Sequence, residues 1–324
     1  MPFHIPTIDI APFLADPTSE ASAQVVADVR TACMATGFFS LVGHNVPRDL
    51  QQRLLAASAK LFALPLETKK TLRPPIGSAL LNRGYELIGA QVLQEGALPD
   101  LKEGFFIGQD IPYGDPRAHK HPLLMGANVF PADADNFDEA TLREPAEAYY
   151  TAVLRLARTV LAVLARGLPY GDDVFAEFVA NDPVCNLRLL HYPPQRSEDA
   201  RQLGAGAHTD FGAVTLLYQD GSGGLEVLDA ATGDWVAVAP NADAYVVNVG
   251  DMLSLWTKNV YKSNVHRVIN RGSTDRYSIP FFVDGNLDTK LAPLDGSAPL
   301  DGGDVLTAEQ HLLKRLGKSY SITV

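Results

Sequence analysis

The chain is poor in cysteine. It has only Cys33 and Cys185 among its 324 residues. Two thiols cannot build the disulfide framework of a small secreted scaffold, so we expect a reduced environment. The first ten residues, MPFHIPTIDI, lack the basic start and the apolar run of a signal peptide. We therefore expect a cytoplasmic protein.

Long apolar runs and basic blocks are also scarce. No uninterrupted apolar run approaches the roughly 20 residues that span a bilayer, so we expect no membrane partner. The 38 acidic residues outnumber the 27 basic ones, which gives a net charge of −11. An acidic chain without a basic block is a poor candidate for binding nucleic acid. Nothing in the pattern predicts an oligomeric state.

What the chain does contain is typical of a globular domain. Apolar residues make up 46% and charged residues 20% of it, which is enough for a sizeable core. No repeat, low-complexity tract or polar linker divides it. We therefore predict a single domain over 1–324. It has a mostly helical and loop portion at 1–183, a β-rich catalytic core at 184–290 and a C-terminal helical portion at 291–324.

Apolar residues recur at helical spacing in four stretches. This spacing predicts helices over 19–36, 47–63, 145–168 and 307–318. The stripe in 145–168 is the clearest, and such a stripe is typical of a helix that packs along a sheet. Residues 76–143 carry many glycines, prolines and aspartates with little periodicity. We expect long loops with short elements there, lying over a site.

Short runs rich in β-forming residues, separated by Gly and Asp turn signals, dominate the second half of the chain. Strands are predicted at 5–14, 38–42, 186–192, 213–219, 225–228, 235–238, 244–249, 266–269 and 276–283. Many short, closely spaced strands favour a jelly roll. The fold class we predict is α+β, with this jelly roll braced by the long helix and by the N-terminal helical region.

Three residues on predicted strands form a candidate metal site. His208 and Asp210 are two residues apart, so an extended backbone presents both on one face. His266 follows 58 residues later, on another predicted strand. Two imidazoles and one carboxylate are the donor set of the facial triad of non-haem iron(II) oxygenases. A His-X-Asp step alone is common, so the interpretation depends on the whole combination.

Arg276 and Ser278 supply a second half of the site, beginning ten residues after His266. A guanidinium beside a hydroxyl can hold a carboxylate through charge-assisted hydrogen bonds. The charges of iron(II), Asp210, a bound 2-oxoglutarate and Arg276 cancel. A buried site with cancelling charges avoids the cost of an uncompensated ion. The sequence therefore predicts iron(II), 2-oxoglutarate and dioxygen as cofactor and cosubstrates.

Longer motifs around these residues carry a family resemblance over nearly the whole chain. GFFSLVGHNVP (37–47), GAHTDFGAVTLLYQD (206–220), KSNVHRV (262–268) and RYSIPFF (276–282) resemble segments of the isopenicillin N synthase-like iron(II)- and 2-oxoglutarate-dependent dioxygenases. LRLLHYP (187–193) is similar to a motif of the thymine dioxygenase-type hydroxylases. The resemblance implies that the jelly roll is a distorted double-stranded β-helix.

The resemblance also implies a role for each polar residue. The implied iron ligands are His208, Asp210 and His266. Arg276 and Ser278 match the pair that holds the distal carboxylate of 2-oxoglutarate. Halogenation needs a chloride in place of the carboxylate ligand, so Asp210 disfavours that reaction.

Four other residues could each have either of two roles. Tyr192 matches a tyrosine that bonds the 2-oxoglutarate carboxylate, or it packs at a strand end. Arg188 points toward the substrate, or it pairs with a surface carboxylate. Phe211 and Phe282 line the pocket, or they belong to the core. Asn248 is expected to be a structural turn residue.

The function implied is oxidation of a small organic molecule. We expect hydroxylation of an unactivated C–H bond, with 2-oxoglutarate converted to succinate and carbon dioxide. The alternatives are a 2-oxoglutarate-independent oxidase or cyclase of the isopenicillin N synthase type, a desaturase or cyclase that begins with the same hydrogen abstraction, and a catalytically idle binding protein. A nucleobase, a small aromatic acid or a natural-product scaffold would each suit the sequence as substrate.

Overall fold

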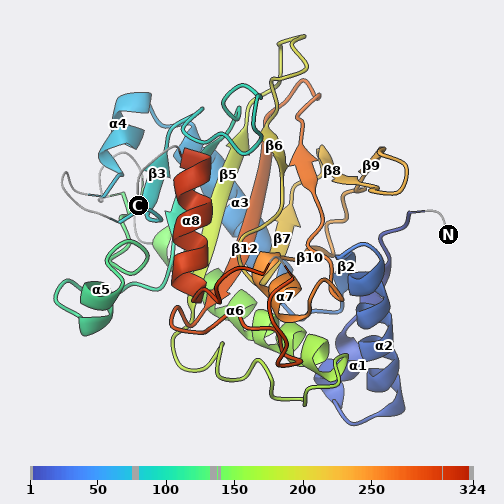
Figure 1. The fold of residues 1–324 in the computed structure, drawn as a ribbon. Coiled ribbons are helices and arrows are strands. Elements are labelled where there is room, and N and C mark those ends of the chain that lie inside the picture. The colour runs from blue at the N-terminus through green and yellow to red at the C-terminus, as the bar shows by residue number, and fades with distance from the viewer. Residues whose placement is uncertain (1–2, 75–79, 132–136, 138–139, 301, 321–324) are drawn as a thin grey trace.

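The computed structural model describes residues 3–74, 80–131, 137, 140–300 and 302–320. Its largest element is an eight-stranded sheet in the order β1-β2-β10-β7-β12-β5-β4-β3 (Figure 1). The strands of this main sheet are β1 (Thr7–Asp9), β2 (Phe38–Val42), β3 (Gly84–Glu86), β4 (Glu103–Ile107), β5 (Val184–Tyr192), β7 (Val214–Gln219), β10 (Tyr245–Val249) and β12 (Arg276–Gly285).

A second, four-stranded sheet lies against one face of the main sheet. Its order is β6-β11-β8-β9. Its strands are β6 (Ala205–His208), β8 (Leu225–Leu228), β9 (Trp235–Ala237) and β11 (His266–Val268). Leu190 and Val246 of the main sheet pack with Val227 and Val268 of the small sheet in one buried apolar cluster. Two facing sheets around an apolar layer form the predicted jelly-roll core.

Long helices cover the other face of the main sheet, and the C-terminal helix lies on the side of the small sheet. The helices are α1 (Ala11–Ala15), α2 (Glu20–Ala35), α3 (Arg48–Phe62), α4 (Leu66–Thr71), α5 (Pro116–Lys120), α6 (Arg143–Arg166), α7 (Asp251–Trp256) and α8 (Ala308–Tyr320). Helix α3 packs on β5 and β12, and α6 packs on β7 and β12 (Figure 1). The predicted α+β class, with a long helix bracing the sheet, is confirmed.

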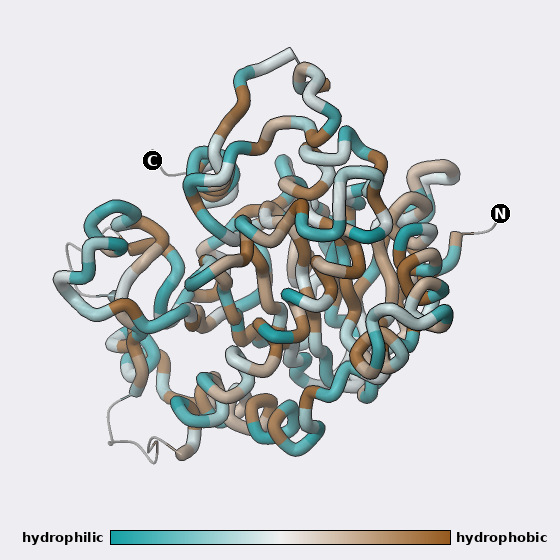
Figure 2. The backbone as a smooth tube through the Cα atoms, turned by 90° about the horizontal axis from the view of Figure 1, so that it is seen from below, coloured by the Kyte–Doolittle hydropathy of each residue, from teal (hydrophilic) through white to brown (hydrophobic). Residues whose placement is uncertain are grey.

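Side chains of β5 alternate between the two layers. Leu187 and Leu189 belong to the core shared with the helices, whereas Leu190 and Tyr192 belong to the layer between the sheets. This two-residue period follows from the pleat of an extended strand. Figure 2 shows hydrophobic segments in the central strands and hydrophilic ones on many outer loops. Even-numbered residues of β5 therefore face the small sheet, where the candidate site lies.

Helix α6 is long and apolar enough, by length and composition alone, to cross a membrane, and it is the one such helix among the described residues. Its sequence contains no uninterrupted apolar run of that length, because Arg155 and Arg158 interrupt the stretch. Half of the most apolar 18-residue stretch of this helix is buried, and the helix contacts α2, α3 and the main sheet. A core helix passes the same test, so the observation is weak support for a membrane span.

Some local predictions were wrong. The predicted strand 5–14 is a three-residue strand followed by α1, because Pro12 starts a helix at its first turn. Strand β6 was missed because its sequence, AGAH, carries no β-forming residues. The prediction of long loops with short elements over 76–143 is confirmed in the described part, which contains the short elements β3, β4 and α5 and the first residue of α6. Its residues 76–79, 132–136 and 138–139 lie outside the described chain.

Candidate active site

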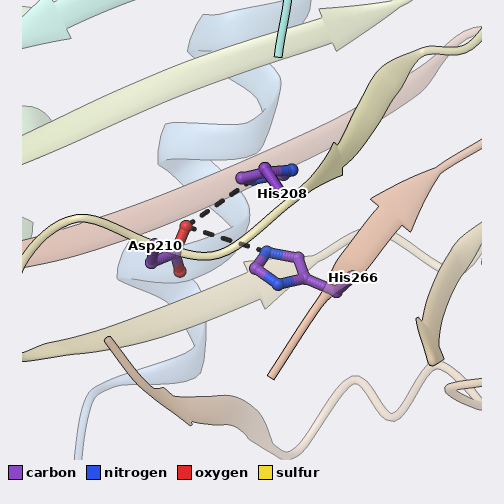
Figure 3. Close-up of side chains that lie close together, drawn as sticks. All are labelled: His208, Asp210 and His266. Atoms are coloured by element: carbon purple, nitrogen blue, oxygen red, sulfur yellow. Dashed lines mark ion pairs between the residues drawn. The ribbon is translucent and has the colours of Figure 1, made fainter. Parts of the chain in front are cut away.

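His208, Asp210 and His266 meet at the inner face of the small sheet. His208 on β6 and His266 on β11 are direct cross-strand partners, and Asp210 follows β6 by two residues. Asp210 Oδ1 lies 3.6 Å from His208 Nε2 and 3.7 Å from His266 Nε2 (Figure 3). One ligand atom from each residue lies within 4.8 Å of the others. These separations exceed hydrogen-bond lengths and suit atoms that share a cation.

The two imidazoles have their Nε2 lone pairs free. His208 Nδ1 lies 2.7 Å from the Gly206 carbonyl oxygen, and His266 Nδ1 lies 3.3 Å from the Asn264 carbonyl oxygen. A carbonyl can only accept, so it places the proton on Nδ1. Burial, together with the neighbouring His266 ring, lowers the pKa of His208 to about 3. The His208 imidazole is therefore neutral near pH 7, which is the form that can bind a metal ion.

Asp210 is held by two donors on its other oxygen. Thr215 Oγ1 donates to Asp210 Oδ2 at 2.6 Å, and Asn248 Nδ2 donates to the same oxygen at 2.7 Å. Burial opposes ionisation, but the adjacent imidazoles and these donors lower the pKa of Asp210. The predicted turn role of Asn248 is wrong, because this residue lies in β10. The nitrogen, nitrogen and oxygen donors fit iron(II).

Arg276 is a buried cation without a carboxylate partner. Its side chain starts from β12, and the residue is 1% exposed. Its Nη2 donates to Gln219 Oε1 at 2.7 Å and its Nε donates to the Gly223 carbonyl at 2.5 Å. No ion pair to Arg276 exists among the described residues. A buried guanidinium in neutral surroundings requires an anion.

Ser278 and Tyr192 complete this end of the site. Arg276 Nη1 lies 3.4 Å from Ser278 Oγ, and the guanidinium lies 4.7 Å from the centre of the Tyr192 ring. Tyr192 is the cross-strand partner of Arg276. All three residues line one cavity together with His208, Asp210 and His266. The structure thus brings together the six polar residues that the sequence singled out for iron and 2-oxoglutarate.

Lys102 is a further cation at this cavity, and the sequence did not indicate it. It is 3% exposed and forms an ion pair with Asp100. Burial lowers the pKa of Lys102 although Asp100 opposes the shift. Asp100 Oδ1 also accepts from the Gly206 backbone amide at 2.9 Å, next to the end of β6. The pair is neutral as a whole, so Arg276 keeps the uncompensated charge.

A neighbouring cavity of about 100 Å³ opens on the other side of His208 and Asp210. Leu312 and Leu316 of α8 line it, as do Phe211 and Phe282, which were singled out from the sequence. Residues of β5, of α8 and of the 76–143 region, which was expected to lie over a site, meet there. Its walls are mostly apolar, with a few polar side chains among them, as is typical of a small-molecule site.

Arg188 borders both cavities, but its charge is already matched. Its Nη2 forms an ion pair with Glu86, and its guanidinium stacks on the Phe106 ring at 4.3 Å. Tyr320 of α8 donates to the other Glu86 oxygen. The expected surface carboxylate partner is wrong, because Glu86 is only 8% exposed. Arg188 therefore presents little net charge to a ligand.

The sequence pattern gave several buried polar residues no role in the site. They are polar residues inside otherwise apolar strands: Asn186, Thr215, Gln219, Asn248 and Asp284. Each is less than 9% exposed and lines a cavity or bonds a residue that does. A polar side chain at a buried strand position needs a partner, and that rule could have marked them.

Two family models match this chain, one in its first half and one in its β-rich second half. Residues 183–285 match the model of the 2OG-Fe(II) oxygenase superfamily, and residues 5–133 match that of the non-haem dioxygenase in morphine synthesis N-terminal region. The 2-oxoglutarate-dependent dioxygenase citB of Monascus ruber is 51% identical, over 99% of this chain and 97% of its own. The clavatol oxidase claD of Penicillium crustosum is 46% identical, over 99% of this chain and 98% of its own.

A solved structure shows the same fold. T7H of Neurospora crassa, in complex with alpha-KG and thymine, superposes with a TM-score of 0.82 and is 28% identical. The superposition covers 97% of this chain and 96% of T7H. The jelly-roll core of this chain therefore resembles that of T7H, whose solved structure contains 2-oxoglutarate.

Proposed function

Because the chain belongs to the 2OG-Fe(II) oxygenase superfamily, we propose that His208, Asp210 and His266 hold its iron and that Arg276 holds its 2-oxoglutarate. The protein is an iron(II)- and 2-oxoglutarate-dependent dioxygenase that oxidises a small molecule. The observation that carries the residue assignment is the buried guanidinium of Arg276, which lacks a carboxylate partner and faces the same cavity as the three ligands.

The chain's own residues have separable tasks in this reaction. When bound, the iron supplies activation of dioxygen, coupled to conversion of 2-oxoglutarate to succinate and carbon dioxide. Arg276 and Ser278 bind the distal carboxylate of 2-oxoglutarate, and the Tyr192 ring covers the guanidinium. Thr215 and Asn248 fix Asp210 so that one oxygen faces the imidazoles.

The substrate binds in the apolar cavity beside the iron ligands and is hydroxylated there. Phe106, Phe211 and Phe282 line this cavity, so a flat ring would contact aromatic faces or edges. The presence of thymine in the T7H structure and the name clavatol oxidase support a small organic substrate. Phe211 and Phe282 are thus substrate-contacting residues in this proposal.

The 2-oxoglutarate-independent oxidase is the weaker alternative. Without a dicarboxylate cosubstrate, Arg276 would remain a buried, uncompensated charge, which is strongly unfavourable. Desaturation and cyclisation share the hydrogen abstraction step with hydroxylation, and the cavity favours none of the three. A cytoplasmic location and the lack of a nucleic-acid or membrane partner stay predictions from composition.

Binding of 2-oxoglutarate tests the proposal directly. Anaerobic protein with iron(II) and 2-oxoglutarate should show a weak visible charge-transfer band, and aerobic protein should release succinate. Arg276→Ala should weaken 2-oxoglutarate binding at least tenfold more than iron binding. Arg271→Ala, which removes an exposed guanidinium in the turn before β12, is the matched control. A wild-type protein without band or succinate would contradict the proposal.

A further inference from the structure

A row of hydrogen-bonded polar side chains crosses one wall of the apolar cavity. Asn82 Nδ2 donates to Asn186 Oδ1 at 2.7 Å, and Asn186 Nδ2 donates to Asp284 Oδ2 at 2.6 Å. Arg83 Nη1 donates to Asn82 Oδ1 at 3.1 Å, at the outer end. Every donor in the row points the same way, so the row ends on the Asp284 carboxylate. The iron and 2-oxoglutarate sites use none of these residues.

The second oxygen of Asp284 is free for a ligand. Within the described chain, Asp284 has one side-chain hydrogen bond, to Asn186, and no cation pairs with it. Its Oδ1 lies where a side chain on Gly212 would stand, since an added Cβ would be 2.5 Å away. Asp284 and Gly212 both line the cavity, so the free oxygen borders the space that the substrate enters.

The charges around the cavity disfavour an anionic substrate. Glu86 neutralises Arg188, which is the cation that lines this cavity among the described residues. Asp284 is 4% exposed and has no counter-charge among the described residues, and this burial raises its pKa to about 7. A carboxylate or phosphate placed here would meet an acceptor oxygen and no free cation.

We propose that Asp284 determines substrate specificity by accepting a hydrogen bond from a hydroxyl or N–H group of a neutral substrate. The Asn82–Asn186 pair holds the carboxylate so that Oδ2 is occupied and Oδ1 faces the ligand. The apolar walls take the rest of the molecule. The inference rests on the proposed function, because it concerns the substrate of the same iron site, and it names a neutral hydrogen-bond donor as the substrate class.

A series of matched probes tests the donor requirement. Calorimetry on anaerobic protein loaded with iron(II) and 2-oxoglutarate would compare 4-methylphenol with 4-methylanisole, and 4-methylpyridin-2-one with its N-methyl derivative. At least one donor should bind about tenfold more tightly than its methylated partner, and the preferred pair distinguishes hydroxyl from N–H. The anion 4-methylbenzoate should bind more weakly than 4-methylphenol.

Asp284→Asn tests which residue sets this preference. The Asn186 amide donates at this position, so it would hold the new carbonyl oxygen, and the new NH₂ group would face the cavity. The tenfold preference should then fall to about onefold, and 4-methylbenzoate should bind more tightly than it does to the wild type. Asp243→Asn, at a surface carboxylate paired with Arg48, should change neither the donor preference nor the binding of 4-methylbenzoate.

The proposal is overturned if the wild type shows no donor preference, or if folded Asp284→Asn keeps an unchanged preference. Equal binding of 4-methylbenzoate and 4-methylphenol to the wild type would also contradict it. The wild-type series decides the question even where the variant does not fold. The visible band with iron(II) and 2-oxoglutarate reports on the Arg276 cavity, so failure of the proposed function would be seen separately.

Discussion

Asn248 on β10 of the main sheet donates a 2.7 Å hydrogen bond to Asp210, which follows β6 of the small sheet. The bond occupies Asp210 Oδ2 and leaves Oδ1 toward His208 and His266. The main sheet thereby orients a ligand that follows the small sheet. The relative position of the two sheets sets the geometry of the candidate iron site.

Removal of this bond should weaken the metal site without removing a ligand. We expect Asn248→Leu to lower iron(II) affinity about 10- to 100-fold, because outer hydrogen bonds orient metal ligands. Anaerobic calorimetry measures the change. Asn241→Leu, at an exposed position that lines neither cavity, is the control. A folded Asn248→Leu protein with wild-type iron affinity would show that Asp210 needs no such support.

Loss of an imidazole should have a larger effect. We expect His208→Ala to abolish both the charge-transfer band and succinate release, because two donors cannot replace the facial set. Absorption and succinate assays measure these two outcomes. His4→Ala, at an exposed histidine near the N-terminus, should match the wild type. Succinate release by His208→Ala at the wild-type rate would refute the ligand assignment.

The buried pair of Arg188 and Glu86 should show strong coupling. Arg188 is 7% and Glu86 is 8% exposed, so Glu86→Gln leaves a buried guanidinium unpaired. We expect a loss of about 3–5 kcal/mol in the free energy of unfolding. The double variant Arg188→Met with Glu86→Gln should lose less than the single changes Arg188→Met and Glu86→Gln added together. Urea unfolding measures all four proteins, and strict additivity would argue against a coupled pair.

His191 should make stability depend on pH. It lies on the opposite face of β5 from the site, where its Nδ1 is 2.8 Å from Glu103 and its Nε2 is 3.0 Å from Asp275. Burial opposes protonation, but the two carboxylates raise the pKa of His191. The raised pKa means that the protonated form stabilises the fold. This stabilisation is complete below the ordinary pKa of about 6.5 and is lost as pH rises through the folded value.

The variant His191→Gln isolates that contribution. We expect it to lose more free energy of unfolding at pH 6 than at pH 9, relative to the wild type, in urea titrations. His119→Gln, at an exposed histidine, should show the same difference at both pH values. An equal loss for His191→Gln at both pH values would mean that packing between Phe62 and Tyr277, not charge, explains its effect.

The sequence by itself determined the fold class, the chemistry and the positions of the central residues. Spacing of two residues on strands places His208 with Asp210 and Arg276 with Ser278, because an extended backbone repeats every second residue. The long helix and most core strands were predicted within a few residues for the same reason, since local periodicity records which face is buried. The family resemblance rests on those same short motifs.

Only the tertiary structure decided what surrounds these groups. Glu86 meets Arg188 across 102 positions of sequence, and Asn82 meets Asn186 across 104. Such pairs depend on strand order and on the course of loops, which local periodicity does not encode. Asp284 directly follows a predicted strand. Only the packing of the sheets shows that no cation among the described residues pairs with it. Substrate selection, in our proposal, lies in this second set of contacts.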